Sequence, residues 1–142
     1  MQRSVPRAVL DPNVLVSALI SPDGPSARLL VEHRTGAFEL VISPLLLDEL
    51  GDVLMREKFR RYVATTEIEE YLALLSGEAL LFEDSKPSGE TLCDDPDDEY
   101  LIALSRTAQV DALVSGDSHL LELVDLIPVL TPREFLESLA NP

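Results

Sequence analysis

Short apolar runs alternate along this chain with longer segments in which apolar residues recur at a helical period. The runs predict five β-strands, at residues 8–10, 38–42, 79–82, 112–114 and 127–130. The longer segments predict helices at residues 25–34, 44–58, 66–78, 96–108 and 132–140, with a short helical turn after Asp117. Alternating strands and helices are typical of βαβ units. We therefore expect an α/β fold with a mostly parallel sheet.

Three of the predicted helices begin with a capping side chain followed by proline. The pairs are Ser43-Pro44, Asp95-Pro96 and Thr131-Pro132. Proline is tolerated at the first helical position because its missing N–H would have no partner there anyway. Glu134 follows Thr131 at the spacing of a capping box, which strengthens the last of these predictions.

Length and composition favour one folded domain. The chain has 142 residues, of which 46% are hydrophobic, so a single domain spanning 1–142 can bury a core. Cys93 is the single cysteine and cannot form an internal disulfide, which suits a reducing compartment. No stretch approaches the roughly 18 apolar residues of a membrane span. We expect a cytoplasmic protein with no membrane contact.

The acidic charge limits the partners that the chain can attract. With 11 Lys and Arg against 26 Asp and Glu, the formal net charge is −15. This charge argues against broad adhesion to nucleic acid, although a local site can still meet phosphate through metal ions. The position of each acid therefore matters more than the total.

Four acids map to one edge of the predicted sheet. Asp11 ends the first strand, Glu49 lies in the helix after the second, Asp98 lies in the first turn of the helix from 96, and Asp117 follows the fourth strand. All strands of a parallel sheet end at the same edge, where ligands bind. Carboxylates gathered there raise one another's pKa values unless cations neutralise them. Their oxygens favour Mg²⁺ or Mn²⁺.

Such a site suits phosphodiester hydrolysis by metal-activated water. We expect Asp11, Asp98 and Asp117 to contact metal directly, and Glu49 to bind metal or orient water. Asn13 and Ser115 are placed to hold the carboxylates, or a phosphate oxygen, by hydrogen bonds. One ion of a pair can activate the water while the other stabilises the leaving oxygen.

Five segments together resemble the PIN-domain (PilT N-terminus) ribonucleases, specifically the VapC-related toxins of toxin–antitoxin pairs. They are VLDPNVLVSAL at 9–19, FELVISPLLLDEL at 38–50, DPDDEYLIAL at 95–104, ALVSGDSHLL at 112–121 and TPREFL at 131–136. The resemblance implies a three-layer α/β/α sandwich, Mg²⁺ or Mn²⁺, cleavage of RNA and an antitoxin partner. Carried over by position, the acids of the family are Asp11, Glu49, Asp98 and Asp117, with Asn13 beside the first.

Two positions depart from the family pattern. Pro12 stands where the family often has a small polar residue, and Glu99 stands where it often has asparagine. Proline removes a backbone donor near the site, and Glu99 adds a negative charge. We expect both to alter the fine geometry and the metal affinity.

The helical phase decides which of two neighbouring acids, Glu49 or Asp48, points toward the predicted site. A shift of one residue in the phase would exchange the helix faces on which they lie. Leu45, Leu46 and Val53 are the phase markers that favour Glu49.

A basic cluster follows the predicted helix 44–58, and two interpretations of it are open. It consists of Arg56, Lys58, Arg60 and Arg61. The first interpretation is a solvated helix end whose cations complement the C-terminal dipole. The second is a phosphate-steering patch that binds RNA.

Two other functions compete with a ribonuclease. One is a non-catalytic acidic module that binds a basic partner peptide. The other is phosphoryl transfer through an aspartyl intermediate, as in phosphatases and receiver domains. Asn13 stands where such phosphatases have a second aspartate, which disfavours the latter. The leucine and valine content of the helices also allows a homodimer.

Overall fold

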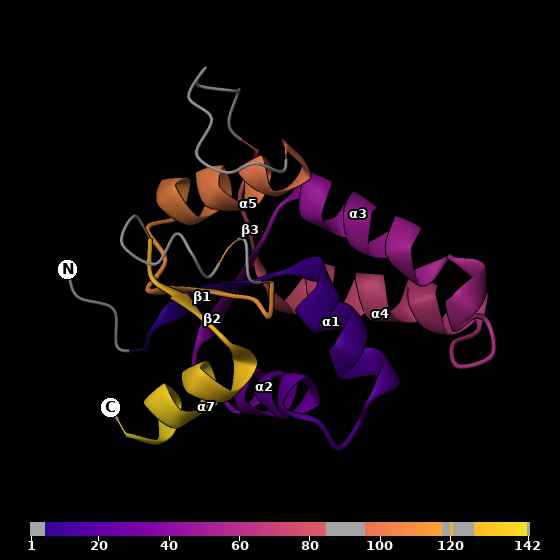
Figure 1. Ribbon diagram of the computed structural model, residues 1–142, viewed down its shortest axis with the longest axis horizontal. Helices are drawn as coiled ribbons and strands as arrows, with labels where there is room; N and C mark the ends of the chain where they lie inside the picture. The colour runs from indigo at the N-terminus through magenta and orange to yellow at the C-terminus, as the bar shows by residue number, and fades with distance from the viewer. Residues whose placement is uncertain (1–4, 85–95, 118–119, 121–126, 142) are drawn as a thin grey trace.

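The computed structural model describes residues 5–84, 96–117, 120 and 127–141, with the backbone alone for 96–98 (Figure 1). Five strands form one sheet in the order β3-β2-β1-β4-β5, and every neighbouring pair is parallel. The strands are β1 (Arg7–Leu10), β2 (Glu39–Ile42), β3 (Leu80–Leu81), β4 (Ala112–Val114) and β5 (Val129–Leu130). The predicted parallel sheet is confirmed.

Helices cover both faces of this sheet. They are α1 (Pro12–Ile20), α2 (Pro25–Arg34), α3 (Pro44–Leu54), α4 (Thr65–Glu78), α5 (Pro96–Thr107) and α7 (Pro132–Ala140), with a 3-10 turn, η1 (Glu57–Phe59). Figure 1 shows α5 on one side of the sheet and α2 with α7 on the other. The three-layer α/β/α sandwich is therefore confirmed. The short helix expected after Asp117 falls outside the described residues.

Helix α1 was not predicted. Asp11 caps it by accepting a hydrogen bond from Asn13 N, and Pro12 occupies its first position. Its helical period is hidden because buried apolar residues line most of it, including Val14, Leu15 and Val16. At a first helical position Pro12 costs the helix no hydrogen bond, and the expected effect of its missing N–H on the metal site remains a prediction.

Helix α3 is shorter than predicted. It ends at Leu54 rather than at 58, and Met55 caps it. The chain then turns through η1, and Val63 is buried in the core. The burial of Val63 requires this turn, whereas the local sequence would allow the helix to continue.

Two of the three predicted caps are confirmed. Ser43 Oγ accepts from Leu46 N at 3.2 Å. Thr131 Oγ1 accepts from Glu134 N at 3.1 Å, and the Glu134 carboxylate accepts from Thr131 N at 2.9 Å. Asp95 lies outside the described residues. Each confirmed cap begins a helix directly after a strand, at the carboxyl edge of the sheet.

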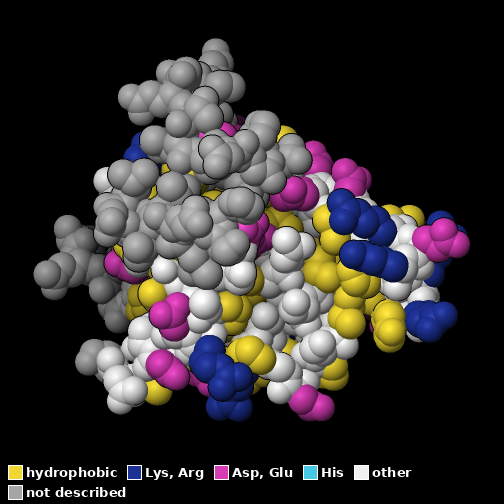
Figure 2. All heavy atoms as spheres, viewed as in Figure 1, with side chains coloured by type: hydrophobic (Ala, Val, Ile, Leu, Met, Phe, Trp, Pro, Cys, Tyr) yellow, Lys and Arg dark blue, Asp and Glu magenta, His cyan; other side chains and the backbone are white. Residues whose placement is uncertain are grey.

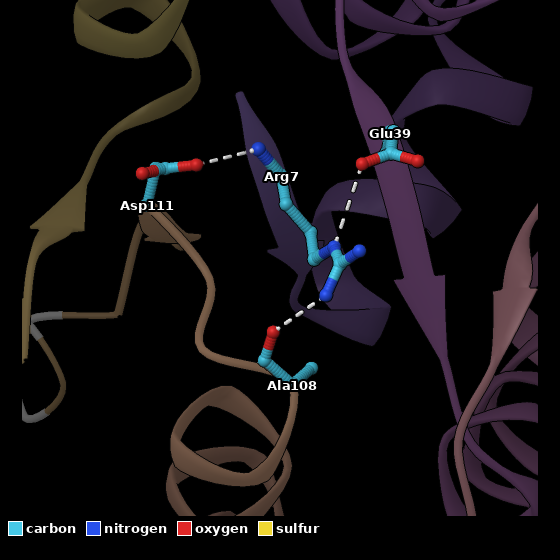
Figure 3. Close-up of polar contacts among 4 residues, drawn as sticks. All are labelled: Arg7, Glu39, Ala108 and Asp111. Carbon is cyan, nitrogen blue, oxygen red and sulfur yellow. Dashed lines mark hydrogen bonds and ion pairs between the residues drawn. The ribbon is translucent and has the colours of Figure 1, made fainter. Parts of the chain in front are cut away.

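At the opposite edge of the sheet, where the strands begin, Arg7 connects β1 to neighbouring segments (Figure 3). Its backbone N donates to Asp111 Oδ2 at 2.8 Å, and its Nη1 donates to the carbonyl of Ala108 at 2.9 Å. Its Nε lies 3.5 Å from Glu39 Oε1. One side chain therefore ties β1 to β2 and to the chain that follows α5, on the edge remote from Asp11.

Among the described helices, none is by itself long and apolar enough to cross a bilayer. Helices α1 and α2 pass such a test only as a joined pair, and the chain bends by 95° between them.

Candidate functional site

Asp11 lies at the carboxyl end of β1, the central strand, and is only 4% exposed. Its backbone N donates to the carbonyl of Val114, at the end of β4, at 2.9 Å. Asn13 N donates to its Oδ1 at 2.9 Å, and the Ser115 hydroxyl donates to its Oδ2 at 2.8 Å. Both carboxylate oxygens are therefore fixed by donors from two separate segments.

Ser115 also fixes the segment that carries Asp117. The backbone N of Asp117 donates to Ser115 Oγ at 2.9 Å, so one hydroxyl contacts both acidic positions. Ser115 itself is fully buried. The structure thus brings together Asp11, Ser115 and Asp117, which were singled out from segments about a hundred residues apart.

The buried position of Asp11 has an electrostatic cost. Burial raises the pKa of the Asp11 carboxyl, and the negative charge of Asp117 raises it further. The hydrogen bonds from Asn13 and Ser115 act in the opposite direction. A buried carboxylate beside a second carboxylate is stabilised by a nearby cation. The side-chain atoms available as metal ligands here are carboxylate and hydroxyl oxygens, which fit Mg²⁺ or Mn²⁺.

Glu49 is partly buried on α3, while Asp48 is exposed. The Tyr100 hydroxyl of α5 donates to Glu49 Oε2, which joins the two helices. Of the three phase markers, Leu46 and Val53 are buried as expected, whereas Leu45 is 47% exposed. Leu45 was therefore a wrong marker, although the partial burial of Glu49 agrees with the sequence argument.

The backbone of Asp98 lies in the first turn of α5, two residues before Tyr100, and its side chain is outside the described part. Among the described side chains, no three Asp, Glu, His or Cys residues are grouped closely enough to hold a metal ion. The pair formed by Asp11 and Asp117 is present, and Glu49 lies against the helix that carries Asp98. Convergence of all four acids remains a prediction.

A cavity of about 340 Å³ opens beside Asp117; we call it the Asp117 cavity. Its described lining consists of Asn13, Val14, Ser17, Ser26, Gly116, Asp117 and Pro132. Sequence reasoning singled out Asn13 and Asp117 but missed Ser17 and Ser26. Ser17 follows Asn13 by four residues, a spacing that would have placed both on one face of α1 had that helix been predicted.

The basic cluster is exposed and lies on the connection between α3 and α4, where Lys58 is part of the 3-10 turn η1. It forms none of the ion pairs found between described residues. Lys58 lies over the Phe59 ring, with its Nζ 5.0 Å from the ring centroid. Figure 2 shows Lys and Arg side chains gathered at this end of the molecule beside hydrophobic ones. The cluster follows the end of α3 directly, so both interpretations, a solvated helix end and a phosphate-steering patch, remain predictions.

A family model described as "PIN domain" matches residues 7–119, which is most of the chain. The match includes β1, with Asp11 at its end, and both Glu49 and Asp117. The protein therefore belongs to the PIN-domain family, as the sequence motifs indicated.

Other proteins resemble this chain in sequence or in fold. The uncharacterised protein MJ1680 of Methanocaldococcus jannaschii is 26% identical over 148 residues, which cover 96% of this chain and 94% of that protein. The crystal structure of PAE2754 from Pyrobaculum aerophilum matches with a TM-score of 0.59 and 16% identity, over 97% of this chain and 91% of that one. The crystal structure of VapBC2 from Rickettsia felis, bound to a DNA fragment from its promoter, matches with a TM-score of 0.57 and 13% identity. The match covers 87% of this chain and 96% of that one. These structures share the fold.

Proposed function

We propose that this PIN domain, acting as one unit over 1–142, is a metal-dependent endoribonuclease. The observation that carries the proposal is the buried Asp11, held by Ser115 beside Asp117 at the carboxyl edge of the sheet. A buried carboxylate in that position does not stabilise the hydrophobic core, whereas a bound cation would offset its charge. Membership of the PIN-domain family supports the same reaction.

Each residue has a defined part in the proposed hydrolysis of RNA. Asp11, Asp98 and Asp117 would together hold Mg²⁺ or Mn²⁺. The bound ion would lower the pKa of an attacking water and offset the charge of the phosphate. Ser115 keeps the Asp11 and Asp117 segments in register through its single hydroxyl. Glu49, fixed by Tyr100, orients the water that attacks the phosphorus.

We also propose that the protein is the toxin of a toxin–antitoxin pair and acts in the cytoplasm. The structural likeness to VapBC2 supports a cognate antitoxin as its partner. A basic antitoxin side chain placed among the carboxylates would neutralise them as a cation does, and would thereby block the site. Binding of the antitoxin and catalysis would then share one set of residues.

Substitution of the two described acids tests the proposal. Asp11→Asn and Asp117→Asn should each reduce Mg²⁺-dependent RNA cleavage by about 100-fold or more, as the loss of a directly acting group does. Asp48→Asn is the matched control, because Asp48 is an exposed acid next to Glu49. Circular dichroism checks that each variant is folded. Full activity in Asp11→Asn would exclude the proposed mechanism.

Calorimetry separates the enzyme from the alternative of an acidic module that binds a basic peptide. Mn²⁺ should bind the wild-type protein at neutral pH, and Asp11→Asn should bind it at least about tenfold more weakly. A wild-type protein that binds no Mn²⁺ would favour the module.

A further inference from the structure

The Asp117 cavity contains polar groups that the protein itself leaves unused. Ser26 is 6% exposed, and its hydroxyl makes no hydrogen bond within the described part of the chain. The side chains of Asn13 and Ser17 likewise have no partner among the described residues, although both are exposed. Ser26 Oγ is not one of the fully buried side-chain atoms that lack a partner in the described part, so the cavity gives water or a ligand access to it.

The charge of the lining indicates which ligand chemistry fits. The described lining includes no Lys or Arg, and its acid, Asp117, repels an anion when no cation is bound. The remaining polar groups are one amide and two hydroxyls, which suit neutral donors and acceptors. Val14 and Pro132 add apolar contact surface. The cavity therefore favours an uncharged, hydroxyl-rich ligand with an apolar face over an anion.

The size of the cavity limits that ligand. Cavities for small molecules range from about 300 to 1,000 Å³. At about 340 Å³ this one lies at the lower end, where a single nucleoside fits and a dinucleotide does not. Its position beside Asp117 places such a nucleoside next to the proposed reaction centre.

We propose that the Asp117 cavity binds the ribose and base of one nucleotide of the substrate, and that Ser17 and Ser26 recognise its ribose hydroxyls. This inference rests on the proposed action on RNA. The 2′-hydroxyl both donates and accepts, so it can pair with a serine hydroxyl and with the Asn13 amide. A 2′-deoxy sugar would displace water from the Ser26 hydroxyl without replacing its hydrogen bond, and a site built for a hydroxyl discriminates against the analogue that lacks it. The cavity thus selects RNA over DNA.

Titration with free nucleosides, followed by NMR, tests this inference. Nucleosides are uncharged, so repulsion by the acidic protein does not interfere, and no divalent metal is needed. Adenosine, guanosine, cytidine and uridine are each compared with their 2′-deoxy forms. At least one ribonucleoside should shift the backbone amide signals of Asn13, Ser17, Ser26 and Gly116. The corresponding deoxynucleoside should bind at least about fivefold more weakly, which is the usual effect of one lost hydrogen bond.

Two variants and a control make the assignment specific. Ser26→Ala should weaken ribonucleoside binding by about fivefold and reduce the preference over the deoxy form. Ser17→Leu should abolish binding by filling the mouth of the cavity, and because Ser17 is exposed this variant should fold normally. Ser76→Ala is the matched control, since Ser76 is an exposed serine of α4 whose hydroxyl bonds Leu72.

The outcomes separate this inference from the proposed function. Absence of any shift up to the solubility limit, shifts confined to other residues, or equal affinity for ribo and deoxy forms would each overturn it. A wild-type protein that binds ribonucleosides in the cavity but never cleaves RNA would instead contradict the proposed function. A protein that cleaves RNA but fails the titration would contradict only the inference.

Discussion

Asp11 has two roles at the level of the single residue. Its carboxylate caps α1 through Asn13 N, and it also meets Ser115 at the carboxyl edge of the sheet. Asparagine caps helices about as well as aspartate. Substitution by asparagine therefore keeps the cap and removes the charge, so the two roles can be separated by experiment.

The raised pKa of Asp11 predicts how stability depends on pH without metal. The folded state binds the proton more tightly than the unfolded state, so stability falls as pH rises from 3.8 through the folded-state pKa. Asp11→Asn should therefore be more stable than the wild type at pH 7 when no metal is present. The difference should shrink as the pH falls below 3.8, because the carboxyl then becomes protonated in the unfolded state as well.

Urea unfolding in EDTA at pH 3.5 and pH 7 measures this effect. A variant that is less stable than the wild type at pH 7 would show that the Asp11 charge stabilises the fold without a cation, contrary to this account.

At the scale of elements, α1 is held from several sides. It packs against α2 and α3, and the Tyr71 hydroxyl of α4 donates to the Leu15 carbonyl at 2.7 Å. Tyr71 is 7% exposed, and burial raises the pKa of its phenol. Because α1 carries Asn13 and Ser17, this contact also holds one wall of the Asp117 cavity in place.

Removal of that hydroxyl should loosen α1. Tyr71→Phe is expected to lower the free energy of unfolding by about 1 kcal/mol, the usual net value of a buried hydrogen bond. Chemical denaturation measures the change. Tyr62→Phe serves as the control because Tyr62 is 61% exposed, and it should leave stability unchanged. Equal stability of the wild type and Tyr71→Phe would mean that the contact is energetically neutral.

Periodicity predicted most elements but neither α1 nor the end of α3. The strands lie close to their predicted positions, because short apolar runs between helices have few other interpretations. Helix α1 was missed because burial on most sides hides its period, and α3 ends early because Val63 is drawn into the core. Parallel topology alone placed Asp11 and Asp117 at one edge. The cavity could not be predicted, because it depends on how α1, α2 and α7 pack.

At the scale of the whole molecule, charge is unevenly distributed. The net charge is −15, yet four of the 11 basic residues lie within the short connection between α3 and α4. An acidic protein that binds RNA needs such a local region to lower the electrostatic barrier to encounter.

Charge reversal tests the basic cluster. Arg60→Glu combined with Arg61→Glu should weaken binding of single-stranded RNA by at least about tenfold, because each lost phosphate contact also removes counterion release. The dependence of affinity on salt should become shallower by about 0.7 per contact. Fluorescence anisotropy over a range of salt concentrations measures both. If affinity and slope are unchanged, the cluster has no part in RNA binding.

The central place of β1 has a consequence for how the protein is made. Asp11 acquires its partner Ser115 from a segment 104 residues further along the chain. A ribosome that has just released the first strand therefore holds a nascent polypeptide whose key aspartate is still solvated and unpaired. The acidic pair can form only after residues 115–117 have left the ribosome. Any activity that needs both acids, such as the proposed hydrolysis of RNA, therefore cannot begin on a nascent chain before Ser115 and Asp117 have been synthesised.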